Sequence, residues 1–230
     1  MNYELIKVCG MRDADNIREV EALFSQRSIV NGQRSMVNGQ WPTFLMGFIF
    51  WPKSKRYVSE KPAYLPTKCK RVGVFVDASI ADIMQRVRDY SLDFVQLHGH
   101  ETPDFIRQLT CHLSLVTYHL SLIKAFNIAT AEDLEATKPY EGIVDYFLFD
   151  TKATLPGGSG QQFDWSILDG YHGVTPFLLS GGIGPEDTER VKTYYHPKCA
   201  GIDLNSRFEL APALKDVSAL SRFLHEISEK

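Results

Sequence analysis

The sequence lacks the features that mark secreted, membrane-spanning and nucleic-acid-binding proteins. Its four cysteines are scattered without a CxxC pair, so they predict free thiols in a reducing compartment. No apolar run approaches the length of a membrane span, and the start, Met1-Asn2-Tyr3-Glu4, has neither the basic nor the apolar region of a signal peptide. The 25 basic and 28 acidic residues give a net charge of −3, which offers little attraction to nucleic acid or an anionic membrane. We therefore expect a cytoplasmic protein with neither partner.

A glycine-rich GxGxxG turn is also missing after the first predicted strand, which argues against a dinucleotide-binding fold. Short β-rich runs instead alternate with amphipathic helical patterns, and eight such units in 230 residues favour one (β/α)8 TIM barrel over residues 1–230. The predicted strands are 5–9, 44–50, 71–77, 94–98, 122–126, 146–150, 177–180 and 201–204. The predicted helices include 15–24, 80–90, 102–111, 131–138, 186–194 and 216–227, with Asp13, Ser79, Thr102 and Thr130 as N-caps.

One segment interrupts this alternation. Residues 27–33 (RSIVNGQ) are followed at once by residues 34–40 (RSMVNGQ), and the two heptads differ only at Ile29 and Met36. The Asn-Gly pairs form turns and each unit is too short to stack as a solenoid, so the pattern predicts a tandem duplication inserted between helix 1 and strand 2. That junction would lie on the N-terminal face of the barrel, opposite the face where such barrels do their chemistry.

The first predicted strand ends in a cysteine with a lysine two residues before it. Because side chains alternate along a strand, Lys7 and Cys9 share one face, and a nearby buried ammonium favours the thiolate over the thiol. A cysteine at a strand end is more often a small buried apolar residue. Its interpretation as a base therefore depends on the ends of the other strands.

Three further strands place polar side chains at their C-terminal ends, where such barrels build their active sites. Gln96 and His98 share one face of the fourth predicted strand. Asp150 closes the sixth, and Asp203 lies near the end of the eighth. Each alone fits a structural role, such as a helix cap or a buried histidine. Together with Cys9 on one rim, they predict an active site.

Glycine-rich or serine-containing turns follow the last three predicted strands. Gly181-Gly182 follows the seventh strand and Asn205-Ser206 follows the eighth, where barrels commonly bind phosphate through free backbone N–H groups and the start of a helix. The turn at 156–165 contains Gly158 and has the length and composition of a mobile lid. The two turns after the seventh and eighth strands predict a phosphorylated substrate.

These motifs make the chain resemble the phosphoribosylanthranilate isomerase family, in the family's order and over nearly the whole sequence. The most specific blocks are residues 95–101 (VQLHGHE) and 157–165 (GGSGQQFDW). Further blocks match at 7–11, 47–50, 54–58, 72–77, 149–151, 179–182 and 203–209, ending near 215–216.

The resemblance implies a cofactor-free isomerase, with no metal, that acts as a monomer or homodimer. It would convert the aminoaldose N-(5'-phosphoribosyl)anthranilate into the aminoketose 1-(2-carboxyphenylamino)-1-deoxyribulose 5-phosphate in tryptophan biosynthesis. Cys9 would be the base and Asp150 the acid, its pKa raised by the apolar stretch Phe147-Leu148-Phe149. Lys7, Arg56, Gln96, His98 and Asp203 would bind the substrate, Arg56 through the anthranilate carboxylate, and Gly158, Gly181, Gly182, Asn205, Ser206 and Arg207 would bind the phosphate.

Three features depart from the family's pattern. The usual Ser-Pro-Arg after strand 2 is Ser54-Lys55-Arg56, which keeps the arginine. The usual Ser-Gly after strand 8 is Ser206-Arg207, so a side chain lies where the family lets backbone approach phosphate. Glycine is not required there if the residue opens a helix, and we expect the guanidinium to assist phosphate binding. The duplicated heptads are the third departure.

Other functions stay open at this stage. A metal-dependent hydrolase could use His98 and His100 with Asp150, but the other histidines lie away from the predicted C-terminal strand ends. Another sugar-phosphate barrel isomerase is possible, although the related enzyme of histidine synthesis would place aspartate where this chain has Cys9. A non-catalytic barrel kept as a binding scaffold would have no need of both Cys9 and Asp150.

Deleting residues 34–40 tests the placement of the repeat. Because the entropy of loop closure changes slowly with loop length, the free energy of unfolding should shift by less than about 1 kcal/mol, as measured by urea denaturation. The kinetic constants kcat and KM should be unchanged. A lost dimer or a large fall in kcat would show that the repeat does more than connect helix 1 to strand 2.

Overall fold

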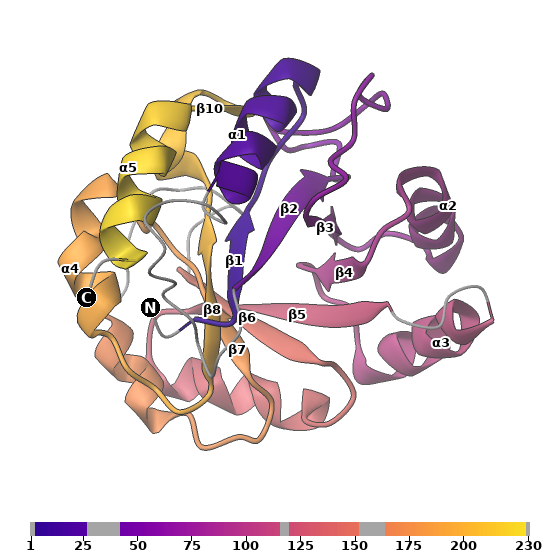
Figure 1. The fold of residues 1–230 in the computed structure, drawn as a ribbon. Helices are drawn as coiled ribbons and strands as arrows, with labels where there is room; N and C mark the ends of the chain where they lie inside the picture. The colour runs from indigo at the N-terminus through magenta and orange to yellow at the C-terminus, as the bar shows by residue number, and fades with distance from the viewer. Residues whose placement is uncertain (1–2, 27–41, 116–119, 152–163, 229–230) are drawn as a thin grey trace.

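The computed structural model describes residues 3–26, 42–115, 120–151 and 164–228, which form a closed barrel (Figure 1). Eight parallel strands follow one another in chain order, and the last pairs with the first to close the ring. The predicted (β/α)8 class is confirmed. The strands are β1 (Leu5–Val8), β2 (Thr43–Ile49), β3 (Lys70–Phe75), β4 (Phe94–Leu97), β5 (Ser121–Ile128), β6 (Tyr146–Thr151), β7 (Phe177–Leu179) and β8 (Cys199–Leu204).

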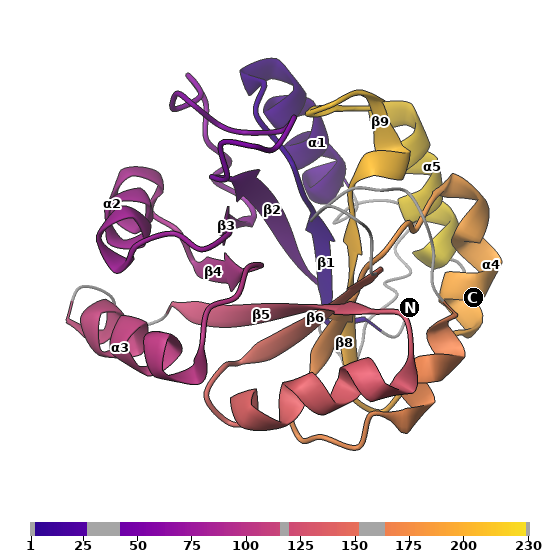
Figure 2. The same ribbon diagram turned by 180° about the vertical axis from the view of Figure 1, so that it is seen from behind.

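Helices surround the ring, and both ribbon views show α5 between α1 and α4 (Figures 1 and 2). Several start at the predicted caps: the Asp13 carboxylate accepts from Asn16 N, and the Ser79 hydroxyl accepts from Asp82 N. At Thr130 the backbone N–H instead donates to Asp133, at 3.0 Å. The α-helices are α1 (Ala14–Gln26), α2 (Ile80–Tyr90), α3 (Pro103–Ser114), α4 (Thr188–Thr193) and α5 (Val217–Ser228).

The outer layer is less regular than the alternating pattern predicts. Residues 51–69, between β2 and β3, contain no helix, which fits their three prolines. The helix predicted at 131–138 is the 3-10 helix η1 (Ala131–Tyr140), whose buried Leu134 and Thr137 are three residues apart, matching its three-residue turn. Elements that were not predicted are the 3-10 helix η2 (Trp165–Gly170) and the hairpin of β9 (Glu209–Ala211) and β10 (Leu214–Lys215).

The barrel interior changes from apolar to polar along the strands. Inward-facing Leu5, Leu45, Ile123 and Leu178 belong to a small apolar cluster inside the ring. Outward-facing side chains form the larger core under the helices. Toward the C-terminal ends of β4, β6 and β8 the inward positions carry polar side chains instead, namely Gln96, Asp150 and Asp203, so the polar groups are concentrated at one end.

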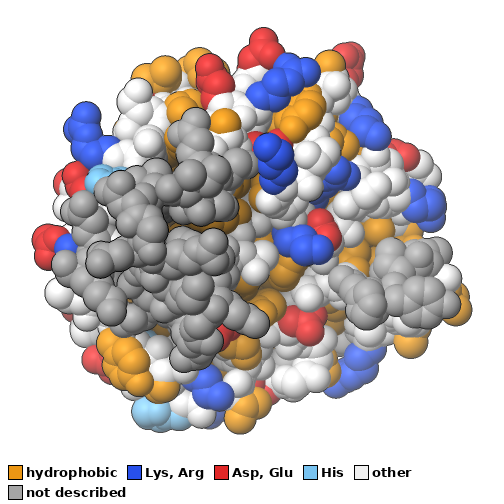
Figure 3. All heavy atoms as spheres, viewed as in Figure 1, with side chains coloured by type: hydrophobic (Ala, Val, Ile, Leu, Met, Phe, Trp, Pro, Cys, Tyr) orange, Lys and Arg blue, Asp and Glu red, His pale blue; other side chains and the backbone are white. Residues whose placement is uncertain are grey.

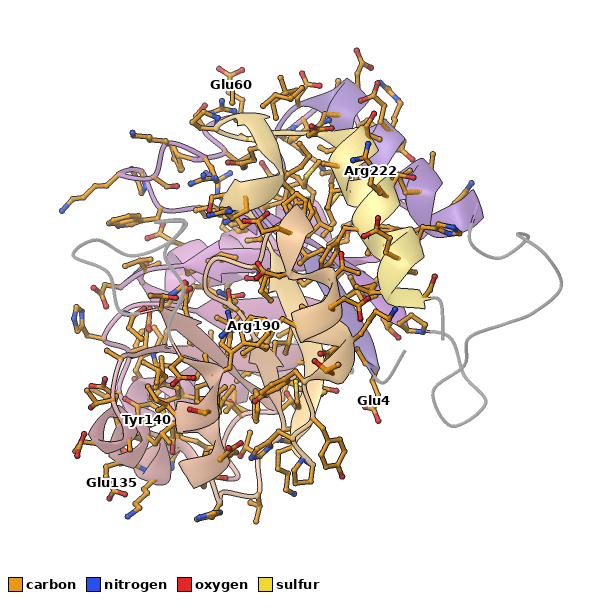
Figure 4. The ribbon with its side chains drawn as sticks, turned by 90° about the vertical axis from the view of Figure 1, so that its left-hand side faces the viewer. Glu4, Glu60, Glu135, Tyr140, Arg190 and Arg222 are labelled. Carbon is orange, nitrogen blue, oxygen red and sulfur yellow. The ribbon has the colours of Figure 1, made fainter. Side chains whose placement is uncertain are left out.

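The surface carries both signs of charge. Figure 3 shows basic and acidic side chains interspersed over the visible face, in keeping with the small net charge. Figure 4 views the side formed by α4 and α5, where Arg190 and Arg222 are labelled. Within the described ranges, no helix is both long and apolar enough to cross a bilayer. The duplicated heptads at 27–40 lie outside those ranges.

Candidate active site

A pocket at the C-terminal ends of the barrel strands encloses about 520 Å³, part of it open to solvent. The inward-facing polar residues of four strands meet there, as the alternation along each strand predicts. Apolar Ile49, Val74 and Ile183 complete its wall. The predicted site residues that line it are Cys9, Gln96, His98, Asp150, Gly181, Gly182, Asp203, Asn205 and Ser206.

Lys7 is fully buried and does not line the pocket. Its Nζ donates to Asp203 Oδ1 at 2.9 Å across the β1–β8 seam, where the two residues are in register. Burial disfavours the ammonium, but the charges of Asp203 and Cys9 and their hydrogen bonds with Nζ together outweigh it and raise the pKa of Lys7. Ser180 Oγ donates to the other oxygen of Asp203 at 3.2 Å. Lys7 thus fixes the position of Asp203 from within the barrel.

Cys9 lies beside Lys7, as predicted, but its thiol is not made acidic. Burial raises the pKa of Cys9, and the lowering caused by the Lys7 ammonium does not reverse that shift. Asp203 raises the pKa further, whereas Lys215 lowers it. The expected effect of Lys7 is therefore present in direction, but burial outweighs it.

Asp150 has the raised pKa that an acid catalyst needs. Burial, followed by the negative charge of Asp203, raises the pKa of Asp150 to about 6, while a 2.8 Å hydrogen bond from Thr151 N lowers it. The expected cause was wrong in part, because Phe147 and Phe149 belong to the outer core on the opposite face of β6. The enclosed barrel interior is what disfavours this carboxylate.

His98 is a neutral neighbour of Asp150. Burial and the charges of Lys124 and Lys7 lower the pKa of His98 to about 4. Its Nε2 is 3.7 Å from Asp150 Oδ2, too far for a hydrogen bond, and its Nδ1 is 3.3 Å from Gln96 Nε2. Among the described residues, His98 Nε2 and Gln96 Oε1 find no hydrogen-bond partner although both are buried. A polar ligand in the pocket would satisfy these two atoms.

The turn after β7 presents backbone to the pocket. Gly181 and Gly182 have φ values of +90° and +72°. A Cβ on Gly181 would lie 2.3 Å from Thr151 Oγ1, so both the conformation and the close approach require glycine. Gly158, predicted to contribute from the preceding loop, lies outside the described residues.

The turn after β8 begins only a short helix, and Arg207 takes a partner within the protein. η4 (Ser206–Phe208) is a three-residue 3-10 helix, so it offers a weaker dipole than the helix start that was predicted. The Arg207 guanidinium pairs with Glu186 of η3 (Pro185–Asp187), and both side chains are about half exposed. This ion pair joins the turn after β7 to the turn after β8.

Arg56 also lies outside the pocket lining. Its Nε donates to both oxygens of Glu209 at 2.9 Å, and its Nη2 donates to Oε2 at 2.6 Å. Lys215 Nζ donates to Glu209 Oε1 at 2.7 Å. A Cβ on Gly10 would lie 2.7 Å from Arg56 Cδ, so the arginine arm packs against the residue that follows Cys9.

The alternative metal site does not assemble. His100 is exposed, and its Nδ1 lies 3.1 Å from Asp77 Oδ2 after β3, whereas His98 faces the pocket. In the part of the chain that the structure describes, His, Cys, Asp and Glu side chains form no group of three able to hold a metal ion. His98, His100 and Asp150 therefore do not converge as a ligand set.

Three polar residues at or beside the site were not predicted. Ser180 lines the pocket and bonds Asp203, and its position at the end of β7 parallels that of Asp150 at the end of β6. Glu209, on the hairpin beyond β8, bonds Arg56, and Lys215 of the same hairpin bonds Glu209. Their charges were visible in the sequence, but nothing in the sequence showed that the hairpin folds back onto the connection after β2.

Comparison with known proteins identifies the family. The model of the N-(5'phosphoribosyl)anthranilate (PRA) isomerase family matches residues 33–226. The N-(5'-phosphoribosyl)anthranilate isomerase of Parabacteroides distasonis is 49% identical over 229 residues, covering 97% of this chain and 93% of its own. The chain belongs to the PRA isomerase family.

Solved structures of PRA isomerases share the barrel. That of the Thermotoga maritima protein has a TM-score of 0.74 at 28% identity, covering 99% of this chain and 98% of its own. Another, in complex with reduced 1-(o-carboxyphenylamino)-1-deoxyribulose 5-phosphate, has a TM-score of 0.71 at 26% identity, covering the same shares of the two chains. The fold and the resemblance inferred from the motifs are both confirmed.

Asp150→Asn is expected to stabilise the folded protein. A carboxyl group whose pKa is about 6 when folded and about 4 when unfolded binds protons more tightly in the folded state, so its contribution to stability is lost as the pH rises. The asparagine avoids that loss. The free energy of unfolding, from urea titrations, should rise by about 2–3 kcal/mol at pH 7.5, with a gain near zero at pH 4 that grows up to about pH 6.

Asp77→Asn is the matched control. A hydrogen bond from the His100 backbone lowers the pKa of Asp77, so this carboxylate contributes stability that is present at neutral pH and lost in acid. Asp77→Asn should therefore lower the free energy of unfolding at neutral pH, whereas Asp150→Asn raises it. A pH-independent effect of Asp150→Asn would show that Asp150 does not have a raised pKa.

Proposed function

We propose that this chain isomerises N-(5'-phosphoribosyl)anthranilate to 1-(2-carboxyphenylamino)-1-deoxyribulose 5-phosphate, a step of tryptophan biosynthesis, by acid–base chemistry of its own side chains without a cofactor. The observation that carries the proposal is that Cys9 and Asp150 line one pocket from the non-adjacent strands β1 and β6. Membership of the PRA isomerase family supplies the substrate. The two groups supply the base and the acid that the rearrangement needs.

Asp150 is the acid that opens the sugar ring. With a pKa of about 6, roughly a tenth of it is protonated at pH 7. It gives its proton to the furanose oxygen, the C1–O bond breaks, and a Schiff base forms between C1 and the anthranilate nitrogen. His98, with a pKa of about 4, is a weaker base than Asp150 and so leaves the proton on the carboxyl group.

Cys9 is the base that completes the rearrangement. Its thiolate removes the proton from C2, giving an enolamine that tautomerises to the ketone. Because burial raises the pKa of Cys9, the form with an ionised Cys9 and a protonated Asp150 is a minor fraction at neutral pH. The rate follows that fraction, which Lys7 increases by opposing the effect of burial on the thiol.

The remaining predicted residues position the substrate. Gly181, Gly182, Asn205 and Ser206 meet the phosphate at the two turns, with Arg207 beside them; Gly158, also expected to bind the phosphate, lies outside the described residues. Gln96 Oε1 and His98 Nε2 bond the sugar hydroxyls, which would satisfy both atoms. Asp203 contacts the substrate as part of the pocket wall, and the buried Lys7 holds Asp203 in position. Arg56 binds the anthranilate carboxylate through the guanidinium edge that Glu209 leaves uncovered.

The cellular setting follows from the same chemistry. All four cysteines are free, which supports a reducing, cytoplasmic location and keeps the Cys9 thiol available. The protein acts there as a monomer or homodimer on a small phosphosugar substrate.

Cys9→Ala tests the base. The variant should lose kcat by a factor on the order of 10² to 10⁴ while still binding the reduced product analogue, because the thiol moves a proton rather than holding the substrate. Conversion of N-(5'-phosphoribosyl)anthranilate would be followed directly, and binding by calorimetry. Asp150→Asn should likewise lose kcat while still binding the reduced product analogue. Cys111→Ala, at an exposed position on α3, is the control and should match the unaltered protein.

Turnover close to normal in Cys9→Ala would sink the assignment of the base. Persistent activity in Asp150→Asn would mean that ring opening uses another acid or is spontaneous. Absence of conversion by the unaltered protein would contradict the proposed reaction itself.

The ion pair between Arg207 and Glu186 leads to a paired test at the phosphate site. Arg207→Gly removes a cation and leaves the Glu186 carboxylate beside the bound dianion, so KM should rise several-fold, more at low salt than at high salt, with kcat nearly unchanged. Glu186→Gln removes the carboxylate that pairs with Arg207 and should lower KM. If Arg207→Gly instead lowers KM, the arginine obstructs the phosphate site.

A further inference from the structure

Arg56, Glu209 and Lys215 form a buried charged trio beside the pocket. The Glu209 side chain is 4% exposed and that of Lys215 is fully buried, while the Arg56 side chain is 11% exposed. The carboxylate lies between the two cations and accepts hydrogen bonds from both. Nothing in the proposed chemistry so far uses Lys215.

Lys215 has three acceptors around its Nζ, which favour the ammonium. Burial nevertheless lowers the pKa of Lys215, and the charge of Glu209 opposes that shift without reversing it. The Nζ of Lys215 donates to Asn205 Oδ1 at 2.8 Å, to Asn205 O at 3.3 Å and to Glu209 Oε1 at 2.7 Å, and only an ammonium has three hydrogens for three acceptors. Its backbone N–H donates to Asn16 Oδ1 at 2.8 Å, and its carbonyl accepts from Asn16 Nδ2 at 3.0 Å. Asn205 in turn lines the pocket. The lysine therefore connects the trio to the pocket wall through fixed contacts.

The trio holds one more positive charge than negative. Burial opposes ionisation of Glu209, but the hydrogen bond from Arg56 and the charge of Lys215 outweigh it and lower the pKa of this carboxyl group, so it is ionised at neutral pH. Two cations then share one carboxylate. A buried excess charge is unfavourable until a counter-ion arrives, which makes the trio a preformed place for an anion.

We propose that Lys215 is a positioning residue for the substrate carboxylate: by sharing Glu209 with Arg56, it leaves one positive charge and one guanidinium edge for the anthranilate group. Glu209 bonds Nε and Nη2, so the edge formed by Nη1 and the outer N–H of Nη2 faces away from it. That edge suits a carboxylate, which it can bind through two parallel hydrogen bonds. The inference rests on the proposed function and extends it to a residue outside the pocket lining.

The chain offers a closely matched control. Lys124 is also a buried lysine paired with a glutamate, with Nζ 3.1 Å from Glu101 Oε2 and both side chains no more than 3% exposed. That pair lies against the outward face of the barrel, where Lys124 also donates to Gly99 O at 2.7 Å. Its loss removes a buried ion pair of the same kind without removing a charge from the trio.

The experiment compares N-(5'-phosphoribosyl)anthranilate with the analogue made from 2-aminobenzamide, which replaces the carboxylate by a neutral amide. In Lys215→Met, Glu209 neutralises Arg56, so the preference in kcat/KM for the carboxylate substrate should fall at least about tenfold, mainly through KM. The KM of the amide analogue should change by less than about threefold. Lys124→Met should leave the preference unchanged even if it lowers stability.

The double variant Lys215→Met/Glu209→Gln separates charge from packing. It removes one charge of each sign, so Arg56 again carries an unshared positive charge and the preference should return to within about threefold of the unaltered protein. If Lys215 were only structural, the double variant would be at least as impaired as the single one. Should Lys215→Met fail to fold, Glu209→Gln replaces it, and the preference for carboxylate should then be kept.

Two failures can be told apart. If the unaltered protein does not convert N-(5'-phosphoribosyl)anthranilate, the proposed function is wrong. If it converts that substrate but Lys215→Met keeps the preference, or the double variant does not restore it, the role of Lys215 is wrong and the isomerase assignment stands.

Discussion

The ion pair between Lys7 and Asp203 is the contact on which the rest of the site depends. It joins the first barrel strand to the last at a matched position, with both side chains inside the ring. A buried pair of this kind is costly to assemble and more costly to break, because either partner left alone would be an uncompensated charge. The contact that closes the barrel between β1 and β8 therefore also positions Asp203 in the site. The same two charges act in opposite directions on Cys9, and Asp203 also contributes to the raised pKa of Asp150.

A second layer of charge surrounds this pair. Lys215 and Arg56 share Glu209 on one side of Cys9, and Arg207 and Glu186 link the turns that follow β7 and β8. In each group the protein supplies cations already oriented by carboxylates. Arginine and lysine would otherwise lose side-chain freedom on meeting an anion, so orientation in advance reduces the entropy lost on binding. In the proposed mechanism, proton transfer takes place inside the ring and anion binding takes place in the connections beyond it.

The sequence predicted those parts that depend on local period and order. Alternation along β4 and β6 was enough to place Gln96, His98 and Asp150 on the inner face, because a strand allows only two faces. It could not predict partners that tertiary folding brings together, such as Arg56 with Glu209, which are 153 residues apart. The same limit applies to η1, because the sequence pattern did not distinguish a 3-10 helix from an α-helix. It applies also to Phe147 and Phe149, which were expected to raise the pKa of Asp150 but pack in the outer core. The hydrophobicity of both residues was clear from the sequence. Because they are an odd number of positions from Asp150 along β6, alternation places them on the opposite face of the strand.

The double hydrogen bond between Asn16 and Lys215 has a consequence for how the enzyme is made. The asparagine amide bonds both the N–H and the carbonyl of Lys215, as a neighbouring strand would, across 199 residues of sequence. Chains leave the ribosome N-terminus first, so Cys9 and Asp150 are synthesised well before residue 215 is available. A nascent barrel therefore contains the two groups of the proposed proton transfer but lacks the lysine that shares Glu209 with Arg56. The proposed carboxylate site is thus completed last, when the residues beyond β8 fold back onto α1.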